Sequence, residues 1–156
     1  MKKIHQKIWQ LATPYQDKRD DQSHAEIVTN YAIKLCKIEK GIGDVIIPAA
    51  ILHDVGWSQL SKEEKFLIFN HNATNSEILE VRYKHQDAGV KISREILNEL
   101  NYPKKIIDEI VEIISQHDTR ESFISKNEGL VRDADKLWRF SKVGFAADIK
   151  RNAFVF

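Results

Sequence analysis

The apolar positions of this chain recur at helical intervals. The clearest stripe follows Pro103 and contains Ile106, Ile107, Ile110, Val111, Ile113 and Ile114. Steps of three and four place such side chains on one face of an α-helix. The sequence shows none of the sustained alternation of apolar and polar residues, punctuated by turns, that a β-sheet requires. The pattern therefore predicts an all-α fold.

About seven helices are expected, packed as a compact bundle. They lie around residues 4–11, after residue 22, from Asp44 to Gly56, after a capping box at 61–64, from 78 to 100, after residue 103, and around 130–138. In the third helix, Asp44 can cap the N-terminus, Pro48 is tolerated in the first turn, and Gly56 ends the helix. The sequence has no linker, repeat or low-complexity segment, which predicts a single domain over residues 1–156.

Composition narrows the class of protein. A length of 156 residues, 42% of them hydrophobic and 30% charged, suits one folded domain and excludes a disordered chain. The formal net charge is +1, so electrostatics gives no reason to expect a nucleic-acid polymer or a membrane surface as partner. Cys36 is the single cysteine, which excludes an internal disulfide framework and a cysteine-rich zinc site.

The apolar runs and the chain ends complete this picture. The longest apolar run, residues 45–52, is far shorter than the about 20 residues that cross a bilayer. Polar residues at 5–7 interrupt any signal-peptide core near the N-terminus. The last residues, 153–156, are apolar and are expected either to dock on the core or to lead into a longer chain. We expect a soluble, cytoplasmic protein, for which oligomers are possible.

Several polar residues occupy positions that the pattern assigns to the core. Three histidines are in phase with apolar stripes, an aspartate lies inside an apolar helix, and a His-Asp pair ends the most apolar segment of the chain. These residues are His24, His53, Asp54, His85, His117 and Asp135. Burying a polar side chain without a partner costs roughly 1–3 kcal/mol, and an ionised carboxylate costs far more.

A shared divalent metal ion would explain all six residues at once. A single buried histidine is more often a core imidazole satisfied by a hydrogen bond, but here each residue would need its own partner. Imidazole and carboxylate are common ligands of divalent metals, and a helical bundle can gather them from facing helices. The sequence lacks a His-Glu-x-x-His or Cys-x-x-Cys motif, so the ligands must come from distant positions.

These residues stand in an order that resembles the HD-domain superfamily of metal-dependent phosphohydrolases. The matching elements are His24, then Leu52-His53-Asp54-Val55-Gly56, then Arg132-Asp133-Ala134-Asp135-Lys136-Leu137, within about residues 19–140. The resemblance implies an all-α HD-type domain in which His24, His53, Asp54 and Asp135 bind a divalent metal. In this alignment Asp135, rather than Asp133, is the final metal ligand.

His85 and His117 are similar to two further histidines in the dinuclear branch of that superfamily. The resemblance implies one or two divalent ions (Fe, Mn, Co, Zn or Mg), with His85 and His117 as ligands of the second ion and Asp54 bridging the pair as a catalytic residue. A metal-activated water would then cleave a phosphoester or phosphoanhydride of a small phosphorylated molecule, for example a nucleotide. The alternative is that both histidines contact the substrate phosphate or a water on a single ion.

The substrate phosphate would need fixed cations. Lys136, next to Asp135, and Arg19, just before the His24 helix, are the leading phosphate-binding candidates. Ordinary surface ion pairing with nearby aspartates is the alternative. Weaker candidates are Arg120, Arg132 and Arg139.

Other conspicuous residues receive less specific expectations. Glu63, Glu64 and Asp118 are undiscriminated candidates for the general acid, although Asp118 can also be a purely local feature of a helix end. His5 and His71 fall outside the stripes that we identified and are expected to be solvated. Trp57 could line a pocket beside the His-Asp pair, but packing is its expected role.

Two other functions compete with phosphate hydrolysis. The dinuclear branch also includes di-iron oxygenases, and imidazole-rich sites favour iron over magnesium. A non-catalytic sensor domain that uses the metal only for folding is the third possibility, because structural metal sites lack a substrate position.

Overall fold

The computed structural model describes residues 1–19 and 21–152, the last two by their backbone alone, and this part of the chain contains helices and no strands. The α-helices are α1 (Lys3–Ala12), α2 (His24–Glu39), α3 (Gly43–Leu52), α4 (Lys62–Leu67), α5 (Asn75–Glu99), α6 (Lys104–Gln116), α7 (Lys126–Leu137) and α8 (Lys142–Asn152). Three 3-10 helices join them: η1 (Thr13–Tyr15), η2 (Val55–Gln59) and η3 (Trp138–Phe140). The all-α prediction is confirmed, whereas the expectation for residues 153–156 lies outside the described residues.

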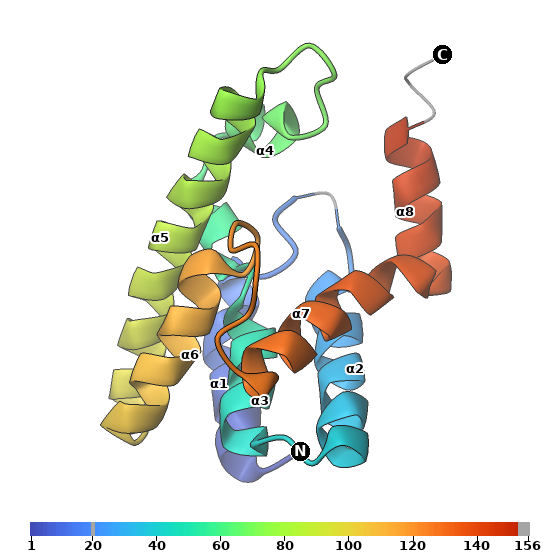
Figure 1. The fold of residues 1–156 in the computed structure, drawn as a ribbon. Coiled ribbons are helices and arrows are strands. Elements are labelled where there is room, and N and C mark those ends of the chain that lie inside the picture. Colours follow the sequence, from blue (N-terminus) through green and yellow to red (C-terminus); the bar gives the residue numbers. More distant parts are fainter. Residues whose placement is uncertain (20, 153–156) are drawn as a thin grey trace.

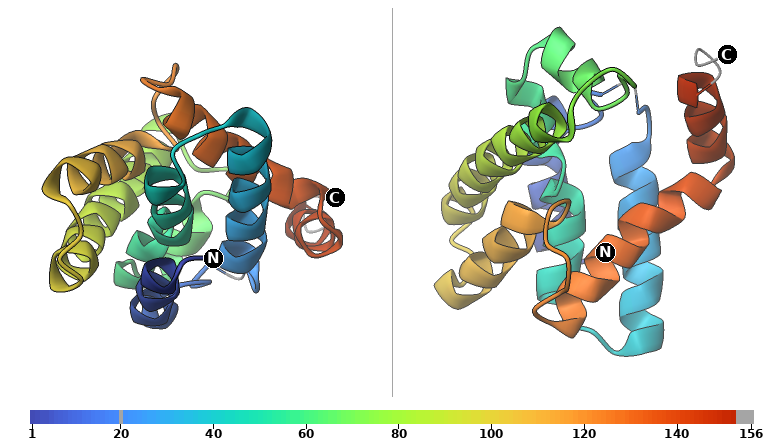
Figure 2. Two further views of the ribbon diagram at one scale, coloured as in Figure 1. Left: turned by 90° about the horizontal axis from the view of Figure 1, so that it is seen from below. Right: turned by 45° about the horizontal axis from the view of Figure 1, so that its top comes forward.

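The seven predicted helices correspond to α1–α7, and α8 was not predicted. Figures 1 and 2 show α8 on the side of the bundle opposite α5 and α6. Phe145 and Ile149 of α8 are exposed, and Ala147 packs against the core. With so few apolar positions facing inward, the sequence of α8 carries no clear stripe.

Helix α3 lies at the centre of the bundle, with α1, α2, α6 and α7 around it (Figure 1 and the left view of Figure 2). Nearly every residue from Val45 to Leu52 is buried, as expected for a helix that is apolar on all sides. The chain then continues directly into His53 and Asp54. The central helix thus delivers the His-Asp pair into the interior.

The expected boundaries of this helix were wrong at both ends. Its N-cap is Ile42, and the helix ends at Leu52, four residues before Gly56. Pro48 lies inside the helix and lacks the N–H that would bond to the carbonyl of Asp44. The hydroxyl of Tyr102 donates to that carbonyl instead, at 2.9 Å, and satisfies it.

Gly56 does not stop a helix but permits a close approach between two segments. Helix η2 packs against α5, and a Cβ atom at Gly56 would collide with the backbone carbonyl of His85 and crowd the amide of Gly89. Only glycine fits at this contact without a backbone shift. The contact brings the His-Asp pair next to His85.

The helices before and along α5 are fixed by capping. The predicted capping box of α4, between Ser61 and Glu64, is confirmed. A second box between Thr74 and Glu77 starts α5 three residues earlier than predicted.

In the described part of the chain, each helix lacks the combination of length and apolar character that a membrane crossing requires.

Candidate metal centre

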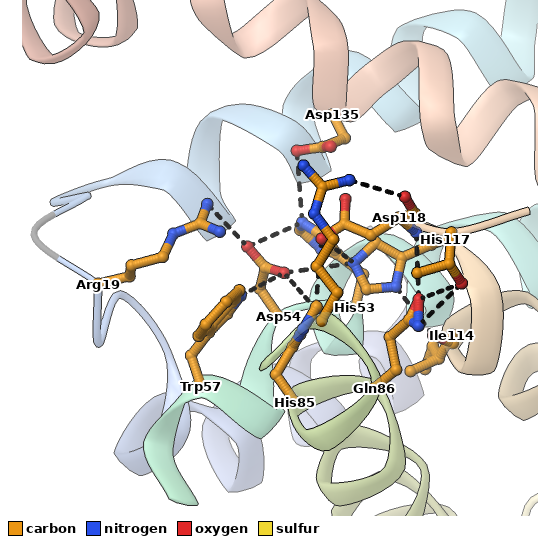
Figure 3. Close-up of polar contacts among 12 residues, drawn as sticks. Arg19, His53, Asp54, Trp57, His85, Gln86, Ile114, His117, Asp118 and Asp135 are labelled. Atoms are coloured by element: carbon orange, nitrogen blue, oxygen red, sulfur yellow. Dashed lines mark hydrogen bonds and ion pairs between the residues drawn. The ribbon is translucent and has the colours of Figure 1, made fainter. Parts of the chain in front are cut away.

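The six predicted ligands meet beside the end of α3, and Figure 3 labels all of them except His24. One group, here called the first triad, consists of His24 from the start of α2, His53 and Asp135 from α7. The Nε2 atoms of His24 and His53 are 3.1 Å apart, and Asp135 Oδ1 lies 3.3 Å from the former and 3.5 Å from the latter. All three ligand atoms could therefore surround one ion.

The second triad consists of Asp54, His85 from α5 and His117 at the end of α6. Asp54 Oδ1 lies 3.4 Å from His117 Nε2 and 3.8 Å from His85 Nε2. These three atoms form the other group in the described residues that could hold a metal ion.

Asp54 joins the two triads. Its Oδ1 atom faces the other two members of the second triad, His85 and His117. Its Oδ2 atom lies 3.3 Å from His24 Nε2 and 3.5 Å from His53 Nε2, both of the first triad. A carboxylate with one oxygen on each side is suited to bridge two cations. The bridging role that the family resemblance implies is compatible with this geometry.

The orientation of the imidazoles fits metal binding. His53 Nδ1 donates to the carbonyl of Ala50 at 2.9 Å, and His117 Nδ1 donates to that of Ile114 at 2.8 Å, which leaves both Nε2 atoms free to act as ligands. Among the described residues, Nε2 of His117 and both nitrogens of the buried His85 have no hydrogen-bond partner. Two ligands that are each about 2.1 Å from an ion lie about 3.0–3.4 Å apart, close to the spacings within the triads.

The ionisable side chains of the two triads shift one another's pKa values. Burial raises the pKa of Asp54, but His53, His117 and His24 outweigh burial and hold it well below its usual range. Burial lowers the pKa of His24, yet hydrogen bonds with Asp135 and Asp54 raise it to about 10. Burial together with the neighbouring His117 lowers the pKa of His85 to about 3, so this imidazole is neutral and available as a ligand.

Arg19 and Trp57 complete one wall of the site. Arg19 Nη2 lies 3.7 Å from Asp54 Oδ2, and its guanidinium stacks over the ring of Trp57 at 4.6 Å. Trp57 Nε1 donates to Asp54 Oδ1 at 3.1 Å, and its ring stacks on His85. Trp57 therefore positions site residues as well as packing. Arg19 also forms an ion pair with Asp21 at 3.7 Å. Pairing with a nearby aspartate, the alternative to phosphate binding, therefore accounts for part of its contacts.

A cavity of about 90 Å³ lies beside the triads. Its lining includes His24, Asp54, Asp118 and Asp135, together with the cations Arg19, Arg82 and Arg139. Arg82 was missed, although it precedes His85 by one helical turn on α5 and therefore shares its face. A larger cavity, of about 540 Å³, runs along α5, and none of the six ligands, all of them in the described residues, lines it.

The remaining predicted cations are placed differently. Lys136 is exposed and lies outside the lining of the smaller cavity, so its phosphate-binding role stays a prediction. Arg139 lines that cavity while also pairing with Asp148. Arg120 instead pairs with two glutamates, Glu112 and Glu128.

Asp118 is more than a local helix-end residue. Its Oδ2 atom lies 3.5 Å from His85 Nε2 and 3.9 Å from His117 Nε2. Glu63 and Glu64 lie at the start of α4, outside the lining of the cavity, and Glu64 bonds to the capping serine and to a lysine. Of the three acid candidates, Asp118 is the one that lines the cavity, and its position next to His117 could have singled it out.

The expectation that His5 is solvated was wrong, whereas His71 is exposed as predicted. His5 is 1% exposed, and its Nε2 atom lies 3.1 Å from Asp44 Oδ1 and 3.4 Å from the hydroxyl of Tyr102. It shares the buried face of α1 with Ile8. The spacing of three residues between them was therefore a usable signal.

Comparison with known proteins adds one finding. A protein-family model described as "HD domain" matches residues 22–139, a range that contains both triads and Asp118. Searches of the curated proteins and of the solved structures found no match.

Proposed function

Since the chain belongs to the HD domain family, we propose that it is a metal-dependent phosphohydrolase that uses two divalent ions to cleave a phosphoester or phosphoanhydride of a small phosphorylated molecule. The observation that carries this proposal is the position of Asp54 between the two ligand groups. One of its carboxylate oxygens belongs to the second triad and the other faces the first, and the guanidinium of Arg19 lies beside it. The family match supports metal-dependent hydrolase chemistry in general. The substrate class rests on the cations around the triads.

In this proposal, one set of residues would bind the metal ions and another would bind the substrate. The first triad and the second triad would each hold one ion, with Asp54 shared between them. A pair of divalent ions supplies Lewis acidity toward phosphoryl oxygens and makes water more acidic. Arg19 is held over Trp57, and in this proposal its guanidinium would bind phosphate oxygens through two parallel hydrogen bonds.

Hydrolysis adds one water across the phosphorus–oxygen bond. The oxygen of the water ends on phosphorus, the bond to the leaving oxygen breaks, and the leaving oxygen takes up a proton. Arg82 and Arg139 bring further positive charge to the cavity. Three guanidinium groups beside two ions favour a substrate with several anionic oxygens, such as a nucleotide.

The test uses the full chain, stripped with a chelator and reloaded separately with Mn²⁺, Fe²⁺, Co²⁺, Zn²⁺ or Mg²⁺. We expect phosphate release from members of a panel of phosphoesters and nucleotides, abolished by Asp54→Asn. Asp133→Asn is the matched control, because Asp133 is exposed on α7 beside the first triad. Release from no substrate with any of these metals would contradict the proposal.

A di-iron oxygenase is the second candidate, favoured by the four imidazoles of the two triads. Anaerobic loading with Fe²⁺ followed by oxygen would then give a mixed-valent signal in electron paramagnetic resonance. A redox-silent centre would rule this function out. A purely structural metal site is less compatible with the cavity beside the triads, because structural sites are closed to substrate.

A further inference from the structure

We propose that Asp118 is a seventh metal ligand, the terminal carboxylate of the second triad. This inference rests on the two-ion site of the proposed function. It assigns to the second ion a set of donors equivalent to that of the first: two imidazoles, one carboxylate of its own and the shared Asp54.

The distances in the two triads support this equivalence. In the first triad, the terminal Asp135 Oδ1 lies 3.3 and 3.5 Å from the two imidazole Nε2 atoms. In the second, Asp118 Oδ2 lies 3.5 and 3.9 Å from Nε2 of His85 and His117. Each carboxylate oxygen thus faces a pair of imidazole nitrogens across a gap of similar size. Direct hydrogen bonds of normal length would be shorter than most of these distances.

The nitrogens that face Asp118 have unmet bonding capacity. His85 is fully buried, and within the described residues neither of its ring nitrogens has a hydrogen-bond partner. The same holds for Nε2 of His117, which is 6% exposed as a residue. Leaving such groups unsatisfied is costly in a folded protein. A cation held between the two imidazoles and the Asp118 carboxylate would give Nε2 of His85, Nε2 of His117 and the carboxylate oxygen a partner.

Helix α5 fixes the position of Asp118. The backbone N–H of Asp118 donates to Gln86 Oε1 at 3.3 Å, and its carbonyl accepts from Arg82 Nη1 at 3.1 Å. Gln86 is fully buried and also bonds to the hydroxyl of Thr119. The helix that supplies His85 therefore also anchors the residue that faces it (Figure 3). Such anchoring is what a metal ligand needs in order to hold its geometry.

Charge also favours a further carboxylate at this place. Two divalent ions carry more positive charge than Asp54 and Asp135 neutralise, and Arg19 adds to the excess. Uncompensated charge in a buried site is expensive. Asp118 would remove one positive charge at the second ion and leave the anion-binding role to the arginines.

A thiolate at position 118 gives the most direct test, because it reports contact with the ion without substrate. We expect Asp118→Cys loaded with Co²⁺ to show a thiolate-to-cobalt charge-transfer band in the near ultraviolet. Wild type and Asp133→Cys should lack the band. Cys36 is present in all three proteins, and its thiol donates to the carbonyl of Gly41.

Affinity supplies the second measurement, and it remains informative if the cysteine variant fails to fold. In calorimetric titrations of the chelator-stripped chain with Mn²⁺, wild type and Asp133→Asn should bind two ions. In Asp118→Asn one of the two should bind at least about tenfold more weakly. One ion per wild-type chain, unchanged affinities in Asp118→Asn, or two bound Co²⁺ without a band in Asp118→Cys would overturn the assignment. A chain that shows the band but releases no phosphate would support the ligand and contradict only the proposed phosphohydrolase activity.

Discussion

The two ends of α3 carry buried histidines beside aspartates, yet they are built differently. At the start of the helix, Lys2, His5, Asp44 and Tyr102 form what we call the N-terminal polar cluster. Lys2 Nζ bonds to the Asp44 carboxylate at 2.6 Å, and His5 Nε2 reaches both the carboxylate and the tyrosine hydroxyl. At the end of the helix, four imidazoles and two aspartates converge on the two triads.

The difference lies in the balance of donors and acceptors. In the N-terminal polar cluster a lysine and a hydroxyl supply the donors that the aspartate needs, and one ring nitrogen of His5 is left over. In the triads, two buried ring nitrogens, Nε2 of His85 and Nε2 of His117, face carboxylates and lack hydrogen-bond partners among the described residues. Within residues 1–19 and 21–152, the two triads are the groups of side chains that could hold a metal ion. A buried histidine is therefore a weak signal, and convergence of several unsatisfied nitrogens is a strong one.

The largest expected effect comes from comparing an asparagine substitution of the aspartate at one end of α3 with the same substitution at the other end. Asp54→Asn removes the carboxylate shared by both triads and should lower kcat by at least about 10²–10³-fold, because charge stabilisation in the site is lost. Asp44→Asn should leave kcat within about threefold of wild type and lower stability by about 1 kcal/mol, through its weakened contacts with Lys2 and His5. Phosphate release and denaturant unfolding measure both. Equal kcat values for the two variants would show that the ends of the helix do not differ in function.

Gly56→Ala should have the next largest effect, on stability and on metal binding together. A methyl group there collides with the backbone of His85 and forces η2 away from α5, so we expect a loss of about 1–3 kcal/mol or more. Gly43→Ala, at the start of α3, is the control, since its added Cβ would meet side chains only at ordinary contact distances of 3.6 and 3.7 Å. Urea unfolding measures both variants, and a Gly56→Ala protein as stable as Gly43→Ala would refute the close-approach argument.

Tyr102→Phe should separate stability from function. Removing the hydroxyl leaves the Asp44 carbonyl, freed by Pro48, without its partner, which should cost about 1–2 kcal/mol. Binding of Mn²⁺ should be unchanged, because the triads are at the other end of α3. Tyr83→Phe, at an exposed position of α5, should change neither property. A loss of metal binding in Tyr102→Phe would mean that the two ends of the helix are coupled.

The smallest expected effect is a pH dependence of stability from His5. Burial lowers the pKa of His5 below its ordinary 6.5, with Asp44 opposing in part, so the folded protein binds a proton there less readily than the unfolded chain. Stability from neutral His5 is therefore present above pH 6.5 and lost as the pH falls toward the lowered pKa. Urea unfolding of wild type, His5→Leu and the exposed control His71→Leu across this range measures it. We expect a shallower loss in His5→Leu alone, and identical pH profiles for wild type and His5→Leu would contradict this role.

The sequence was informative where a residue type conflicted with its surroundings. The predicted ligands stood out because imidazoles and carboxylates occupied positions that the helical pattern assigns to the core, and the order of motifs suggested how they combine. Apolar stripes together with capping and turn signals, such as the Ser61–Glu64 capping box, predicted α1–α7. Helix α8 has only a narrow inward face, so the pattern did not predict it.

Contacts between distant segments were beyond the sequence. The stacking of Trp57 on Arg19 and His85 and the bond from Arg82 to the carbonyl of Asp118 depend on how η2 and α5 face the triads. The Tyr102 bond to the carbonyl freed by Pro48 joins positions 58 residues apart. His5 was misjudged for a different reason, because a single polar residue in a short helix was not weighed against Ile8 three positions on.

The metal content of the full chain tests the central claim most directly. After removal of metals with a chelator and reconstitution with Mn²⁺, elemental mass spectrometry should find two ions per wild-type chain and markedly fewer in Asp54→Asn, with Asp44→Asn equal to wild type. A wild-type chain that retains no Mn²⁺, or an Asp54→Asn chain that retains as much as wild type, would contradict the assignment of the triads as a metal centre.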